Sequence, residues 1–180
     1  MSYYIRRVNS EFWEDELPKD GYLSMPVDGI TNCCKTFSNT LSIWKADSLD
    51  IYDASNKKLL AAIALVYDRP RPLTFIFLTD EELSSIGLIL DETPGDTPVE
   101  DYRPKHRDIC SLTLDTIGKL AWIIHEKVNN DDCYNLITAE EVSEFTKEMF
   151  PEFDLLPEKI KHRRSGVVYI NNELDLSTGY

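Results

Sequence analysis

The chain alternates between short apolar runs and longer segments whose apolar residues recur every three or four positions. Residues 73–78, Leu-Thr-Phe-Ile-Phe-Leu, form a continuous apolar run, which is typical of a central strand covered on both faces. The other segments with strand-like alternation or a short apolar run are residues 3–8, 39–45, 88–90, 108–114 and 166–170.

Helical periodicity is clearest at residues 55–67 and 115–128, where each segment carries one apolar stripe. Two capping boxes, Thr79 with Glu82 and Thr138 with Glu141, predict that further helices begin at these points. The mixture of strands and helices predicts one α+β domain over residues 1–180. We expect a mixed or mainly antiparallel sheet of about five to six strands, with the helices packed mainly on one side.

A long loop over residues 91–107 interrupts this pattern. Its prolines and glycine exclude the interior of a helix or of a central strand. Loops of this length inside a compact domain tend to be functional or disordered. A polar tail over about residues 171–180 is expected to fray.

The composition is strongly acidic, with 32 Asp and Glu residues against 19 Lys and Arg residues and a net charge of −13. Such a field repels phosphate backbones and anionic lipids, so we expect no direct binding to nucleic acid or membranes, whereas a basic protein would be attracted. The simpler explanation is that the acidity keeps the protein soluble. There is no apolar run long enough for a bilayer, no signal-peptide pattern and no C-x-x-C motif, which favours a cytoplasmic protein in a reducing compartment.

The acidic residues are unevenly distributed. Residues 73–102 carry eight acids and no Lys or Arg. We therefore predict an acidic binding face for a basic partner, and an inhibitor of a nucleic-acid-acting protein, of the immunity or antitoxin kind, would fit. The predicted face consists of Asp80, Glu81, Asp91, Glu92, Asp96, Glu100 and Asp101.

Two clusters of basic residues support an alternative. If they meet in the fold, they form an anion site for a phosphate or nucleotide in a small enzyme or ligand-binding protein. The residues of this alternative are Arg103, Lys105, His106, Arg107, Arg163 and Arg164. The competing explanation is that each cluster neutralises neighbouring acids in surface ion pairs.

The sequence contains no recognised catalytic, nucleotide-binding or metal-binding motif, so no catalytic residue, metal or cofactor is predicted. A hydrolase that uses His106 with Asp96 or Asp101 and a cysteine is chemically feasible, but it depends only on residue types near one loop. A homodimer sealed by exposed aromatic side chains is a third alternative. The residues in question are Tyr3, Tyr4, Trp13 and Trp44.

Overall fold

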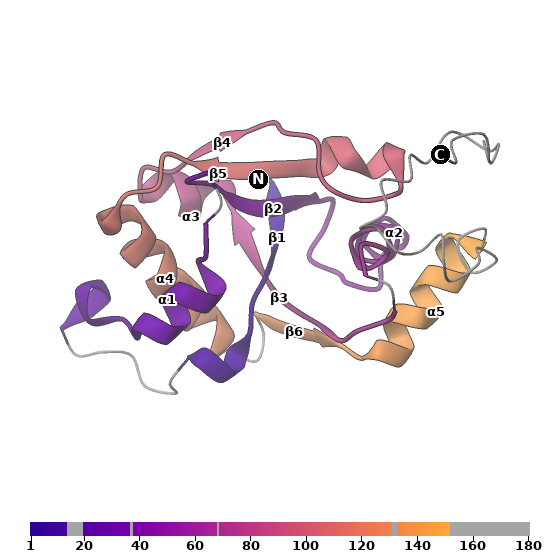
Figure 1. Cartoon of the computed structure of the whole chain (residues 1–180), viewed down its shortest axis with the longest axis horizontal. Helices are drawn as coiled ribbons and strands as arrows, with labels where there is room; N and C mark the ends of the chain where they lie inside the picture. Colours follow the sequence, from indigo (N-terminus) through magenta and orange to yellow (C-terminus); the bar gives the residue numbers. More distant parts are fainter. Residues whose placement is uncertain (14–19, 37, 68, 131–132, 152–180) are drawn as a thin grey trace, which may run out of the picture.

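The protein is described by a computed structural model that covers residues 1–13, 20–36, 38–67, 69–130 and 133–151 (Figure 1). The strands are β1 (Tyr3–Arg7), β2 (Leu41–Ala46), β3 (Leu73–Thr79), β4 (Ile89–Asp91), β5 (His106–Cys110) and β6 (Tyr134–Ile137). The α-helices are α1 (Val27–Cys33), α2 (Ala54–Ala64), α3 (Asp80–Ser85), α4 (Leu114–Val128) and α5 (Ala139–Met149). Short 3-10 helices are η1 (Ser10–Phe12), η2 (Gly21–Ser24) and η3 (Glu100–Lys105). The predicted strand at 166–170 and the predicted tail lie outside these residues.

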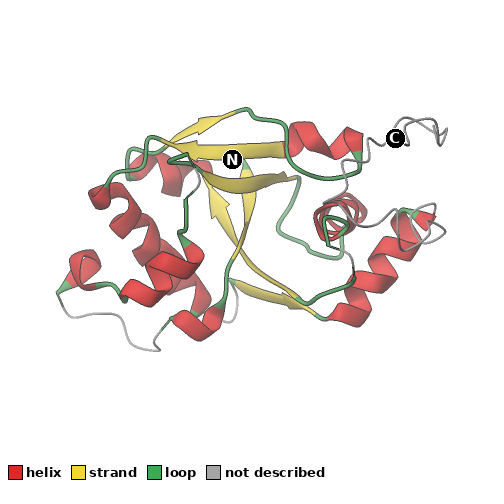
Figure 2. Cartoon of the chain, in the orientation of Figure 1, coloured by secondary structure: helices red, strands yellow, loops and turns green. Residues whose placement is uncertain are grey.

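In the described ranges the strands form one six-stranded sheet in the order β4-β5-β2-β1-β3-β6, and every pair is antiparallel. Tyr3 of β1 lies opposite Ala46 of β2 and Thr79 of β3. The predicted α+β fold and the number of strands are therefore confirmed. Figure 2 shows the helices grouped around both faces of this twisted sheet.

The placement of the helices differs from the prediction that they pack mainly on one side. Tyr4, Ile76 and Leu78 belong to one buried cluster, whereas Ile5 and Phe75, their neighbours along the same strands, belong to another. Successive side chains of a strand point to opposite faces, so the central strands are apolar on both sides. Each face must then be covered, and helices pack on both.

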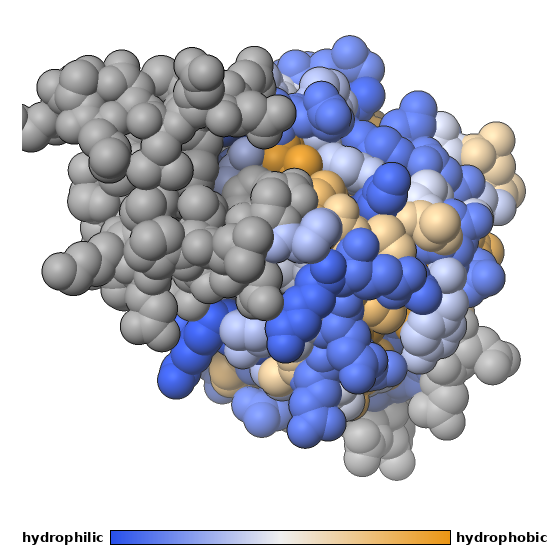
Figure 3. Space-filling view, turned by 90° about the vertical axis from the view of Figure 1, so that its right-hand side faces the viewer, coloured by the Kyte–Doolittle hydropathy of each residue, from blue (hydrophilic) through white to orange (hydrophobic). Residues whose placement is uncertain are grey.

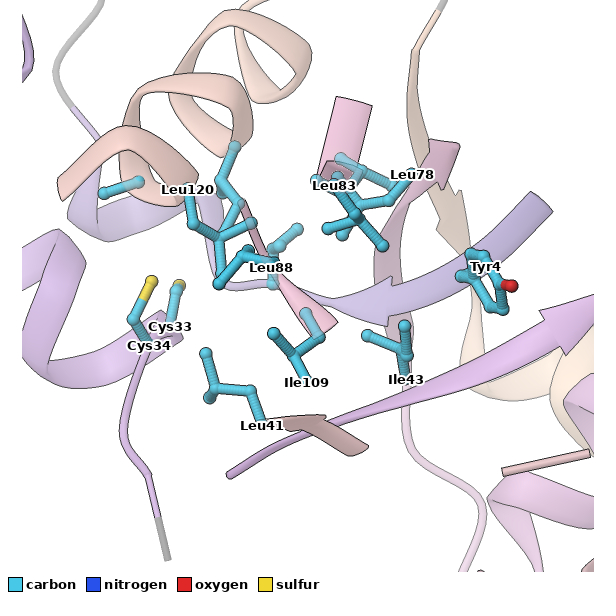
Figure 4. Close-up of a cluster of buried hydrophobic side chains, with 14 of the residues drawn as sticks. Tyr4, Cys33, Cys34, Leu41, Ile43, Leu78, Leu83, Leu88, Ile109 and Leu120 are labelled. Atoms are coloured by element: carbon cyan, nitrogen blue, oxygen red, sulfur yellow. The ribbon is translucent and has the colours of Figure 1, made fainter. Parts of the chain in front are cut away.

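The two cores draw on different helices. Cys33 and Cys34 from α1 and its C-cap, Leu83 from α3 and Leu120 from α4 complete the first core, which Figure 4 shows. Residues of α2 and α5, including Leu60 and Phe145, complete the second. Among the described residues, no helix is both long and apolar enough to cross a membrane.

Both predicted capping boxes are confirmed. Thr79 Oγ1 accepts from the backbone N–H of Glu82 at 3.2 Å, and a Glu82 carboxylate oxygen accepts from the backbone N–H of Thr79 at 2.8 Å. The same pair of bonds joins Thr138 and Glu141 at the start of α5. These boxes satisfy N–H groups that a helix terminus leaves without an intrahelical partner.

The predicted 91–107 loop is ordered and shorter than expected, because β4 extends to Asp91 and β5 begins at His106. Its middle lies against Trp44, and a Cβ atom at Gly95 would overlap the Trp44 ring and the His106 side chain. Thr97 Oγ1 donates to the carbonyl of Ala62 in α2 at 2.6 Å. Only glycine fits so close to a packed ring, so Gly95 allows the loop to close over the sheet.

The expectation of exposed aromatic side chains is wrong for three of the four residues. Tyr4 and Trp13 are buried in the first core and Trp44 in the second. Large aromatic rings that complete an intramolecular core are not available to seal a dimer.

Candidate functional site

Acidic residues gather at one end of the sheet. The antiparallel register places the ends of β2, β3 and β4 beside the starts of β1 and β5. The chain segments at this end, residues 47–53, 80–82 and 91–105, define the acidic end of the molecule. They contain two basic residues, Arg103 and Lys105, against eleven acids. The acids are Asp47, Asp50, Asp53, Asp80, Glu81, Glu82, Asp91, Glu92, Asp96, Glu100 and Asp101.

The predicted acidic face is divided into separate groups. Asp80 and Glu81 follow β3, the fifth strand of the sheet, whereas Asp91 ends β4, the first strand, and the other acids come after it. Four strand spacings separate them, or about 19 Å. Figure 1 shows α3 and η3 well apart along the sheet. The loop 47–53, which follows β2 between them in the strand order, adds acids that sequence reasoning did not include.

Asp80 is bonded to the start of the chain. It accepts from the Tyr4 hydroxyl at 2.7 Å and from the backbone N–H of Ser2 at 3.0 Å. Burial acts to raise the pKa of the Asp80 carboxyl, but these bonds and the N-terminal charge hold it below its usual value. Asp80 therefore has a structural role, whereas its neighbour Glu81 is exposed.

Asp91 and Glu92 also have partners inside the protein. The Cys110 thiol donates to Asp91 at 3.1 Å, and burial together with this bond and nearby charges raises the pKa of Cys110 to about 11. Glu92 forms an ion pair with Arg107 at 2.7 Å. Of the other predicted acids, Asp96, Glu100 and Asp101 are exposed.

The first basic cluster is engaged within the protein. Lys105 pairs with Asp47 at 2.7 Å, and Arg103 Nε donates to the carbonyl of Thr97 at 3.0 Å. Arg107 also donates to the carbonyls of Pro104 and His106 at 2.6 Å each. These contacts hold the 92–105 segment on the sheet. Arg163 and Arg164 lie outside the described residues.

His106 is buried under this loop and contacts Thr93. Its Nδ1 atom lies 3.0 Å from the carbonyl and 3.1 Å from the hydroxyl of Thr93, while that hydroxyl donates to Asp108 at 2.7 Å. The other ring nitrogen is 4.0 Å from Asp108, and the ring meets Trp44 edge to face. The contacts of Thr93 with His106 and Asp108 thus fix the loop to β5. The hydrolase alternative instead paired His106 with Asp96 or Asp101 and a cysteine.

The ion pair between Lys105 and Asp47 brings η3 beside the loop 47–53. Lys105 also lies over the Tyr102 ring, 5.9 Å from its centre. Burial, followed by the charges of Asp47 and Asp101, raises the pKa of Tyr102. The loop 47–53 and η3 therefore form one continuous carboxylate-rich surface, while Asp80 and Glu81 lie further along the same end.

The described part of the chain shows no metal centre, and its best-formed pocket lies away from the basic residues. No group of three His, Cys, Asp or Glu residues there could hold a metal ion. A pocket of about 390 Å³ lies near η1 and α1, and none of the basic-cluster residues lines it; its lining residues are Glu11, Phe12, Trp13, Pro26, Val27 and Asp28. The chain matches no protein-family model, no curated protein and no solved structure.

Proposed function

We propose that this protein is a cytoplasmic interaction module that binds a basic protein partner through its acidic end. One observation carries the proposal, namely the excess of eleven acids over two basic residues in three segments that lie along one end of the sheet. An inhibitor that covers the cationic surface of a nucleic-acid-acting protein would use such a surface in place of phosphates.

Exposure of the carboxylates supports this role. Asp50, Glu81, Glu100 and Asp101 are exposed and can approach a partner without disturbing the core. Charges of one sign accelerate encounter with an oppositely charged protein and orient it, and this attraction weakens as salt is added.

Matched charge variants test the proposal. The acidic-end variant carries Asp50→Asn, Glu100→Gln and Asp101→Asn. The control variant carries Glu11→Gln, Asp28→Asn and Glu126→Gln, three exposed positions outside the acidic end. Both lose three negative charges. The probe is a short peptide of alternating lysine and serine, titrated by calorimetry from about 0.05 M to about 0.5 M salt.

The acidic-end variant is expected to bind the peptide several-fold more weakly than the control, with a smaller salt dependence. Equal binding by the two variants would show that only the overall charge matters, and would refute a localised binding surface.

The anion-site alternative has no comparable support. Arg103, Lys105, His106 and Arg107 have bonding partners inside the protein, as described above.

A further inference from the structure

The loop 47–53 exposes two large apolar side chains among its carboxylates. Leu49 is 53% exposed and Tyr52 is 57% exposed. They alternate along the chain with Asp47, Asp50 and Asp53. Exposed apolar surface with a rim of polar residues is typical of interaction sites.

The backbone of this loop is held by a buried side chain. Asn56, in the first turn of α2, is 1% exposed. Its amide nitrogen donates to the carbonyl of Asp50 at 2.8 Å, and to the carbonyl and hydroxyl of Ser48 at 2.9 and 3.2 Å. Its amide oxygen accepts from the backbone N–H of Asp47 at 3.3 Å. Because these bonds already order the loop, little conformational entropy remains to be lost when a partner binds.

Tyr52 is restrained as well. Its ring meets Phe145 of α5 edge to face with 6.3 Å between ring centres, and its hydroxyl donates to Glu141 at 3.3 Å. The charge of Glu141, together with burial, raises the pKa of the Tyr52 hydroxyl above its ordinary value. A restrained aromatic side chain on an exposed residue has the properties of an interface anchor.

From these contacts we infer that the loop 47–53 is the centre of the binding surface, with Leu49 and Tyr52 as its apolar anchors. This inference rests on the proposed function and names the partner's chemistry. The partner presents an apolar side chain flanked by lysine or arginine, because Leu49 and Tyr52 favour apolar contact and the exposed carboxylates of the same surface, on Asp50, Glu100 and Asp101, attract cations. A uniformly cationic partner without apolar residues would leave the anchors exposed to water.

Two peptides of equal length and charge test the inference. One alternates lysine and serine; in the other, serines in its centre are replaced by leucine. Wild-type protein is expected to bind the leucine peptide about tenfold more tightly than the serine peptide. Leu49→Ser and Tyr52→Ser should each remove most of this preference and leave the affinity for the serine peptide unchanged.

Leu114→Ser is the matched control, since Leu114 is 92% exposed at the start of α4, outside the acidic end. It should retain the full preference. Circular dichroism and thermal unfolding report whether each variant folds. If Tyr52→Ser does not fold, Leu49→Ser still tests the inference, because it leaves the contacts of Tyr52 with Phe145 and Glu141 in place.

The outcomes separate the two proposals. If wild-type protein does not prefer the leucine peptide, or if Leu49→Ser keeps that preference, the loop 47–53 is not the apolar contact. Salt-dependent binding of both peptides would in that case still support the acidic surface. If the acidic-end charge variant binds each peptide as tightly as the control charge variant does, the proposed function itself fails.

Discussion

Charged side chains at the two ends of the sheet differ in how far they are engaged within the protein. At the acidic end, Glu81, Glu100 and Asp101 are exposed. At the other end, where β1 finishes, Arg6 donates to the carbonyls of Ser42 and Cys33. Arg7 and Arg71 nearby lie over the Tyr67 ring at 5.0 and 5.1 Å from its centre.

The comparison distinguishes charged side chains that maintain the fold, such as Arg6, from exposed carboxylates that are available to a partner. Arg6 bridges β2 and the last turn of α1, where a cation is also favoured by the helix dipole. A charge that is bonded to backbone carbonyls should affect stability strongly when it is removed, whereas an exposed carboxylate should affect binding and hardly change stability.

The largest loss of stability is expected for Arg6→Ala, at about 3 kcal/mol, because two carbonyls lose a charged donor and the side chain leaves a gap. Urea unfolding measures the change, and Arg7→Ala is the control, because Arg7 is an exposed residue whose guanidinium bonds to the Tyr67 side chain. A loss no larger than that of the control would mean that Arg6 does not hold α1 on the sheet.

Asn56→Ala should cost about 2 kcal/mol, since the carbonyls of Ser48 and Asp50 and the N–H of Asp47 lose their partner. Faster hydrogen exchange in residues 47–53 than in the rest of the molecule should accompany the loss. Unchanged exchange in this loop would contradict its being held by Asn56, and would weaken the argument that it is ordered before binding.

Asp80→Asn should cost about 1 kcal/mol at neutral pH, because Tyr4 and Ser2 lose a charged acceptor. The folded protein lowers the pKa of this carboxyl, so its stabilisation is present above the ordinary carboxyl pKa of about 4 and is lost as the pH falls through the lower folded value. Thermal unfolding of both proteins should therefore show a gap at pH 7 that closes in acid. A gap that is independent of pH would argue against ionisation as the cause.

The smallest effect is expected for the acidic-end charge variant with changes at Asp50, Glu100 and Asp101. These positions are exposed, so the free energy of unfolding should change by no more than about 0.5 kcal/mol. A larger destabilisation in urea would show that these carboxylates support the fold, and would remove the contrast between the two ends.

Local sequence patterns predicted local structure well. The capping boxes at Thr79 and Thr138 each begin a helix, and residues 73–78 form a strand with buried residues on both faces. These features depend on contacts within a few residues. At α2 the N-cap is Asp53, whose carboxylate accepts from the backbone N–H and the hydroxyl of Ser55, so this helix begins one residue before the predicted start at residue 55.

The arrangement of the site depends on long-range pairing and was only partly predictable. No local pattern showed that β5, β2 and β1 would separate β4 from β3, and so divide the acids of residues 80–101. One missed signal was available, however. Asn56 lies three and four positions before Leu59 and Leu60, on the apolar stripe of its helix, and a polar residue there indicates a buried hydrogen-bonding role.

The hydropathy of the side that faces right in Figure 1 gives a further view of the surface. The coloured part of Figure 3 is mostly hydrophilic, with a smaller number of apolar residues among the polar ones. A surface of this kind favours a polar, charge-guided interface with a few apolar anchors.

Backbone amide NMR during titration with the lysine–serine peptide tests the central claim most directly. The account predicts that the largest shift changes fall in residues 47–53 and 100–105, and that they diminish as salt is added. Shift changes spread evenly over the molecule, or concentrated at Glu11 and Asp28 near α1, would contradict a binding surface at the acidic end.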